Sequence, residues 1–219
     1  MKKIISFSLW GDNPKYTIGA IRNAELAKEI YPDWICRFYV GKSVPTGIIN
    51  VLSKITNTEV IFMDEQGDWT GMFWRFYACE DSDIMISRDT DSRLSLREKS
   101  AVDEWLNSDK DFHIMRDHPY HTTEILGGMW GCRNGILKNI KNLINEYTKG
   151  NFWQVDQNFL KEKVYPIINT SSLIHDSFLN FEKEKNKFPT ERKNKEFVGD
   201  VFDEFDNRHP EYYLKIYEK

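Results

Sequence analysis

The sequence predicts an α/β protein with a mostly parallel central sheet flanked by helices, and two observations support this prediction. Short apolar, β-prone runs alternate with segments of helical periodicity through the first ninety residues, which is the pattern of successive βαβ units. The chain has 219 residues, of which 40% are hydrophobic and 14% aromatic, so it can form one sizeable core. We find no internal repeat and no dividing linker, so we expect a single domain over 1–219.

The first part of the chain supplies four expected strands separated by helices. An apolar run at 3–10 ends in the turn sequence WGDNP, and a periodic segment at 16–30 predicts a helix that Pro32 stops. The elements expected after it are a strand at 34–40, a helix at 46–55, a strand at 58–63, a short aromatic helix at 71–80 and a strand at 83–87.

The second part mixes helices with later strands. Ser95 is a good N-cap for a helix at 95–106, and Glu98 three residues later completes a capping box. The charge-rich segment at 182–196 indicates a solvated, mobile loop. The other expected elements are strands at 112–117 and 125–132, a helix at 135–147 and a helix from 155 that ends before Pro166.

Charge, cysteine content and hydropathy exclude several classes of protein. The formal net charge is −4 with acids and bases mixed along the chain, which argues against a nucleic-acid binder. Cys36, Cys79 and Cys132 are isolated and odd in number, which indicates free thiols in a reducing compartment rather than disulfides or a zinc site. No run approaches the roughly 20 apolar residues of a membrane span. We therefore expect a cytoplasmic protein with no transmembrane segment.

Two aspartates follow the strand expected at 83–87, in the stretch DIMISRDTDSR. In open α/β sheets, ligands bind at the carboxyl ends of strands. Since alternate residues of an extended segment point to one side, Asp89 and Asp91 can converge on a single cation, and carboxylate oxygens suit Mg²⁺ or Mn²⁺. An alternative stays open, in which the two acids cap the next helix or pair with Arg88 and Arg93.

Two enzyme classes use such an Asp-x-Asp motif. Phosphohydrolases of the haloacid-dehalogenase type use the first Asp as nucleophile, but their motif normally lies on the first strand. Nucleotide-sugar glycosyltransferases carry the motif at the end of the nucleotide-binding half, where it holds a divalent cation on the diphosphate. Here the motif follows three βα units, which favours the glycosyltransferase. A non-catalytic nucleotide-sugar or glycan-binding module is a third hypothesis.

A wider resemblance supports the same choice. The segments MFWRF, ISRDTDSRLSLREKSAVDEWL, FHIMRDHPYH, ILGGMWGC, VDQNFL and IHDSF occur in this order. Over residues 4–202 the chain thus resembles small GT-A-fold glycosyltransferases of bacterial polysaccharide loci and chlorella-type viruses. The resemblance implies a nucleotide-sugar-binding half at 1–92 and an acceptor-binding half at 93–219. It also implies metal-dependent hexosyl transfer from a nucleotide-diphosphate sugar, with uridine expected, to a glycan or another hydroxyl acceptor.

The resemblance further assigns a nucleotide and metal subsite. Residues at the end of the first strand and a nearby stacking tyrosine would contact the base and ribose: Ser8, Leu9, Trp10 and Tyr16. The metal, Mn²⁺ or Mg²⁺, would be held by Asp89, Asp91 and His175, with Arg88 beside them at the sugar and ribose.

A reacting centre is implied by the same resemblance. Arg75 would reach the diphosphate or donor sugar, because a guanidinium inside an aromatic segment needs an anionic partner. The backbone of Gly127, Gly128 and Met129 would approach the sugar closely, as glycine permits. Asp156 and Gln157 would face the donor sugar and the reacting centre.

Structural alternatives accompany these roles. Trp10 can be a core aromatic residue, the two glycines a turn, Asp156 a helix start and His175 a core histidine. His118 and His121 flank Pro119, which disfavours a helical metal site, so we expect them in an acceptor-site loop. The segment at 175–181 lacks the Gly and Lys of the His-x-x-Gly-x-x-Lys motif of eukaryotic relatives. Metal and arginine alone, or a basic residue of 182–196, would then neutralise the diphosphate.

Overall fold

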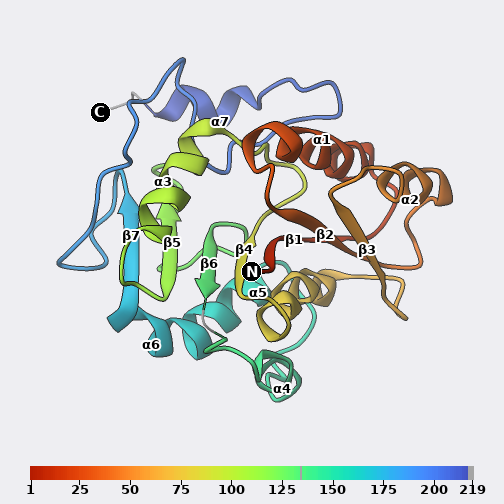
Figure 1. Ribbon diagram of the computed structural model, residues 1–219, viewed down its shortest axis with the longest axis horizontal. Helices are drawn as coiled ribbons and strands as arrows, with labels where there is room; N and C mark the ends of the chain where they lie inside the picture. The colour runs from red at the N-terminus through yellow and green to blue at the C-terminus, as the bar shows by residue number, and fades with distance from the viewer. Residues whose placement is uncertain (134, 217–219) are drawn as a thin grey trace.

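The computed structural model describes residues 1–133 and 135–216, and it has one seven-stranded sheet between two helical layers (Figure 1). The strands lie in the order β3-β2-β1-β4-β6-β5-β7. β6 runs antiparallel to β4 and β5, and the other neighbouring pairs are parallel. The strands are β1 (Lys3–Leu9), β2 (Ile35–Val40), β3 (Thr58–Phe62), β4 (Ile84–Ser87), β5 (Phe112–Arg116), β6 (Trp130–Arg133) and β7 (Ser172–Asp176). The predicted mostly parallel α/β sheet is thus confirmed.

The helices begin and end largely where local signals place them. Asn13 caps α1, its side-chain oxygen accepting a hydrogen bond from the Lys15 amide at 3.0 Å, and Pro14 occupies the first turn. The α-helices are α1 (Pro14–Ile30), α2 (Thr46–Leu52), α3 (Leu96–Leu106), α4 (Ile140–Asn145), α5 (Val155–Phe159), α6 (Tyr165–Ile168) and α7 (Pro210–Lys215). The remaining helical segments are the 3₁₀ helices η1 (Trp69–Glu80) and η3 (Asn169–Ser171) and the π-helical turn η2 (Leu160–Val164).

The sheet separates two hydrophobic cores, as Figure 1 shows for α1 and α2 on one side and α4, α5 and α6 on the other. Alternate strand residues serve the two cores: Ile4 packs with η1 and α5, whereas Ile5 packs with α1, α2 and α3. The same alternation continues on β4, where Met85 faces the first core and Ile86 the second. The two residues after β4 continue the alternation, since Arg88 meets Glu98 of α3 and Asp89 meets Arg75 of η1.

The structure differs from the expected elements at four places, the first being the helix expected at 135–147, which is the shorter α4. The helix that begins at Val155 was expected to end before Pro166, but it continues through η2 into α6, because Pro166 lies in the first turn of α6, where its missing N–H costs little. β6 begins at Trp130 rather than at 125, since Leu126–Met129 form a turn closed by a 3.2 Å hydrogen bond from the Met129 amide to the Leu126 carbonyl. The sequence patterns did not indicate β7 at all.

The capping box at α3 is only half formed. The Ser95 hydroxyl accepts a hydrogen bond from the Glu98 amide at 3.2 Å, as expected of an N-cap. The Glu98 carboxylate instead accepts a hydrogen bond from Arg88 at 2.8 Å. A tertiary ion pair therefore takes the side chain that the local motif would have used.

The charge-rich segment at 182–196 has no helix or strand of its own, but it is not simply solvated. Glu182 pairs with Arg116, and Arg192 pairs with the buried Asp117 at 2.6 Å. Cys36, Cys79 and Cys132 are buried and free, as predicted, and the sulfurs of Cys79 and Cys132 lie 3.3 Å apart. Among the described helices, none combines the length and apolar character needed to cross a membrane.

Candidate active site

The candidate site lies at the carboxyl end of β4. The chain runs outward from β1 to β2 and β3 and then returns to β4 beside β1, so the strand order reverses between β1 and β4. Such a reversal opens a crevice at the carboxyl ends of the strands, where α/β proteins bind ligands. Asp89 and Asp91 follow β4 at this point. The sheet topology thus supports the location predicted from the sequence.

Four side chains, which we call the Arg75 cluster, meet here: Arg75, Asp89, Asp91 and Asp156. Arg75 comes from η1, is 4% exposed and forms ion pairs with both Asp89 and Asp156, the latter at 2.7 Å. Burial raises the pKa of Asp91 most, and the neighbouring Asp89 charge raises it further. The Arg75 guanidinium therefore joins Asp89 to the distant Asp156, and Asp91 is electrostatically coupled to Asp89.

Gly127 and Gly128 make room for this cluster. A Cβ on Gly128 would collide with the Asp89 carboxylate, and one on Gly127 would collide with Arg75 and with Asp156. The Gly127 carbonyl also accepts a 2.6 Å hydrogen bond from the Ser87 hydroxyl, which fixes the turn against β4. The glycines are thus required by the packing of charged side chains, whatever their contact with a sugar.

Asp156 is the most deeply buried acid of the cluster. It lies in the first turn of α5 with 1% of its surface exposed, and burial raises its pKa against the opposing effect of Arg75. Its Oδ1 is buried and has no hydrogen-bond partner among the residues described. An unsatisfied buried acceptor is costly unless a ligand completes it, so this oxygen points to a missing partner. Gln157, the next residue, is half-buried.

Of the residues predicted to bind the base, two are buried in the protein and two are partly exposed. The Ser8 hydroxyl is used internally, because it accepts a hydrogen bond from the Arg75 amide at 3.0 Å, and Leu9 is a core residue with 1% exposure. Trp10 is partly buried, with its ring edge-on to Trp69 at 6.4 Å. Tyr16 is 38% exposed, and its pKa is raised chiefly by burial and next by Asp91, which places it beside the cluster.

Arg88 does not join the Arg75 cluster, which corrects the expectation that it contacts the donor sugar and ribose. Its parity along β4 turns it to the opposite face of the sheet from Asp89. There it is 2% exposed and forms a 2.8 Å ion pair with Glu98. The Glu98 carboxylate also accepts a 3.0 Å hydrogen bond from the Tyr31 hydroxyl, and we call Arg88, Glu98 and Tyr31 the Arg88 cluster.

His175 is likewise not brought to Asp89 and Asp91, so the expected three-residue metal shell is corrected. β7 lies three strands from β4, a separation of about 14 Å at the usual strand spacing. The His175 side chain is fully buried against His113 at 2.8 Å and lies 3.4 Å from the Glu104 carboxylate. Within the described residues, no group of three or more His, Cys, Asp or Glu side chains is arranged to hold a metal.

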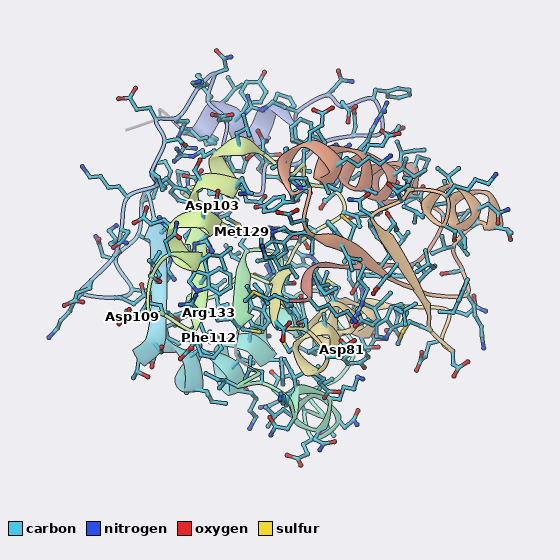
Figure 2. All side chains as sticks on the ribbon, viewed as in Figure 1. Asp81, Asp103, Asp109, Phe112, Met129 and Arg133 are labelled. Atoms are coloured by element: carbon cyan, nitrogen blue, oxygen red, sulfur yellow. The ribbon has the colours of Figure 1, made fainter. Side chains whose placement is uncertain are left out.

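Other predicted residues have structural surroundings. Met129 is 3% exposed and packs against Met115, Phe188 and Val198; Figure 2 shows it at the start of β6, at the opposite end from Arg133. In the loop after β5, His118 is bonded to the Tyr212 carbonyl at 2.9 Å, and His121 accepts a 3.0 Å hydrogen bond from the Asp117 amide. Both histidines are thus used in hydrogen bonds within the protein.

Two contacts of the site could not be predicted from the sequence. The Lys15 ammonium lies 2.8 Å from an Asp91 carboxylate oxygen, and the Phe202 amide donates a 2.8 Å hydrogen bond to the Asp91 carbonyl. The only sequence signal for Lys15 is its place just after the first strand, at the same edge of the sheet as Asp91. Nothing in the local pattern indicates Phe202, which is more than 100 residues away along the chain.

Comparisons with known proteins give matches among solved structures only. No family model matches the chain, and no curated protein matches its sequence. A glycosyltransferase involved in glycosylation of the major capsid of PBCV-1 has 14% sequence identity and a TM-score of 0.54, with 80% of this chain and 82% of that one covered. An active-site mutant of LgtC has 12% identity and a TM-score of 0.50, with 79% and 72% covered. The chain therefore has a GT-A-type fold, the architecture of these glycosyltransferases.

Proposed function

We propose that the protein is a metal-dependent glycosyltransferase that moves a hexose from a nucleotide-diphosphate sugar to a hydroxyl group of a glycan or another acceptor. The observation that carries the proposal is the Arg75 cluster at the strand-order reversal of a GT-A-type fold. The similar PBCV-1 protein is itself a glycosyltransferase, which supports the reaction class. Uridine is the base that we expect in the donor.

The residues present fit a divalent cation. Within the part of the chain that the structure describes, the three carboxylates of the cluster pair with two cationic side chains, Arg75 and Lys15, so one negative charge remains. The Asp89 side chain is 45% exposed and accessible, and Asp156 has an unpartnered oxygen. Mg²⁺ and Mn²⁺ use one or two protein carboxylates together with substrate phosphates. In this proposal Asp89 and Asp91 hold the metal, which supplies Lewis-acid stabilisation of the departing diphosphate.

Arg75 and Asp156 act on the reacting centre. Breaking a bond between a sugar and a diphosphate develops negative charge on the phosphate and oxocarbenium character on the sugar. Arg75, held by two carboxylates, provides positive charge that needs no reorganisation during the reaction. Asp156 has a raised pKa and serves as the base that accepts the acceptor's proton if configuration is inverted.

The two halves of the chain divide the substrates in this proposal. Residues 1–92 bind the nucleotide-sugar, with Trp10 and Tyr16 at the base, and residues 93–219 bind the acceptor. The loop after β5, which contains His118 and His121, belongs to the acceptor side. Gly127 and Gly128 bring backbone close to the sugar in this proposal, because they lie against Arg75 and Asp89, which contact the donor.

The test is release of nucleoside diphosphate from a panel of nucleotide-sugars with Mn²⁺, measured for the unmodified protein and for Asp91→Asn. We expect the substitution to reduce turnover roughly 10²–10³-fold, the range for loss of one preorganised electrostatic stabiliser. Asp109→Asn is a matched control, because Asp109 is exposed at the periphery of the molecule (Figure 2). Release of inorganic phosphate from phosphomonoesters would instead identify a phosphohydrolase. Nucleotide-sugar binding without turnover, unchanged by Asp91→Asn, would identify a binding module.

A further inference from the structure

Lys15 is a charged residue of the site to which the reaction outlined above gives no role. Its Nζ lies 2.8 Å from Asp91 Oδ2, and the two side chains are 31% and 19% exposed. The same ammonium lies 5.2 Å from the centroid of the Tyr16 ring, the residue next to it. Lys15 therefore sits between the predicted metal ligand and the predicted base-stacking residue.

Local structure does not account for a lysine at this position. Lys15 is in the first turn of α1, directly after Pro14, and that turn contains no acidic residue. The amino end of a helix carries partial positive charge, so a cation there is unfavourable. Its ion pair with Asp91 is thus a tertiary contact that offsets a local cost. The position is explained by Asp91 rather than by the helix.

A cation that binds Asp91 has to compete with this ammonium. Asp91 is buried on most sides, since Phe202 covers its backbone and Lys15 occupies the carboxylate. Two cations on one carboxylate repel each other strongly at short distance in a partly desolvated site. The lysine side chain is a flexible stem with a compact charge, so it can leave the carboxylate without rearranging α1.

We propose that Lys15 is the internal counter-ion of Asp91 and that it sets the divalent-cation affinity of the donor-free protein by competing for that carboxylate. The proposal rests on the metal-dependent function described above and adds a positioning residue to it. Lys15 neutralises the Asp91 carboxylate before the substrates arrive. It also makes cation binding weak until a donor diphosphate offers the ammonium another anion.

The experiment measures Mn²⁺ affinity directly, without donor, from the electron paramagnetic resonance signal of free Mn²⁺. We expect Lys15→Met to bind Mn²⁺ about 10-fold more tightly than the unmodified protein, within the usual range of coupling between sites. Lys15→Arg keeps the charge and should retain the weak affinity. Lys28→Met removes the same charge from an exposed position of α1 about 20 Å away and should change nothing.

Two outcomes would overturn the inference. One is a folded Lys15→Met protein, with an unchanged circular dichroism spectrum, whose Mn²⁺ affinity equals or falls below that of the unmodified protein. The other is tightening of equal size in Lys28→Met, which would reflect net charge alone. Failure of the proposed glycosyltransferase function would appear in the diphosphate-release assay. It is distinguishable from failure of the Lys15 inference, because the Mn²⁺ titration needs neither donor nor turnover.

Discussion

Two buried arginines close to the end of β4 are held in different ways. Arg88 is paired with Glu98 on the α1–α3 face of the sheet, and their side chains are only 2% and 3% exposed. Arg75 lies on the opposite face and shares its charge between the buried Asp156 and Asp89, which is 45% exposed. One cluster is closed to solvent, and the other opens to it.

The difference separates a structural ion pair from a candidate ligand site built of the same residue types. In the Arg88 cluster one carboxylate meets one guanidinium, so the charges balance inside the protein. In the Arg75 cluster the acids outnumber the bases with which they pair among the described residues, and the Asp89 side chain is 45% exposed. A buried arginine thus indicates a ligand site when its acidic partners are in excess and accessible, not merely when it adjoins an Asp-x-Asp motif.

The largest expected effect contrasts the two clusters in stability. Glu98→Ala leaves Arg88 buried without a counter-charge, so we expect the free energy of unfolding to fall by about 3–5 kcal/mol. Asp89→Ala leaves Arg75 paired with Asp156, and because the Asp89 carboxylate is half exposed we expect a loss of about 1 kcal/mol or less. Urea unfolding of both variants measures the difference. Equal losses would show that the two clusters do not differ in the way proposed.

Local periodicity predicted the first half of the fold well, because each of its strands is an apolar run bounded by a turn signal. Periodicity does not reveal β7 (Ser172–Asp176), because this strand contains a histidine and an aspartate. Both are buried through tertiary contacts, His175 with His113 and Asp176 with Arg116. The helix through Pro166 was also missed, because a π-helical turn resets the helix just before the proline.

The site divides along a similar line. The sequence indicated that Arg75, Asp89 and Asp156 belong together, and the structure places them in contact. Arg88 and His175 were assigned to the same site by the family resemblance, which carries neither the strand order of this chain nor the face that a residue occupies. Lys15 has no local sequence signal of its contact, because its partner Asp91 is 76 residues away along the chain.

A smaller effect is expected from closing the space between Gly128 and the Arg75 cluster. In Gly128→Ala the new Cβ would collide with the Asp89 carboxylate, so Asp89 has to move. We expect a loss of diphosphate release of about 10²-fold, typical of a displaced catalytic group, with folding retained. Gly47→Ala is the matched control, because its Cβ would meet nothing within 4 Å in α2. If Gly128→Ala retained full activity, the position of Asp89 would not matter to the reaction.

The smallest expected effect is a loss of stability at low pH, caused by a buried histidine on the same side of the sheet as the Arg88 cluster. His113 is fully buried on the same face as Arg88, and its pKa lies well below the usual value because of burial first, then His175 and Arg88. The unfolded chain takes up a proton near pH 6.5 that the folded protein does not, so stability is retained above this pH and is lost as the pH falls below it. From this one group we expect about 1.4 kcal/mol less stability at pH 5.5 than at pH 7.5.

Urea unfolding at these two pH values measures that loss, and His113→Gln should remove most of it, whereas His209→Gln at an exposed position should not. Asp91, in the Arg75 cluster, should contribute a pH dependence of stability with the opposite sign. Its pKa is raised in the folded protein, so its contribution to stability decreases as the pH rises above the pKa that it has in the unfolded chain. Acid should thus weaken the α1–α3 face, where histidines are held neutral, while it relieves the crowded carboxylates of the Arg75 cluster. If Asp91→Asn changed the pH dependence of stability between these two pH values more than His113→Gln does, the assignment of the acid sensitivity to the buried histidine would be wrong.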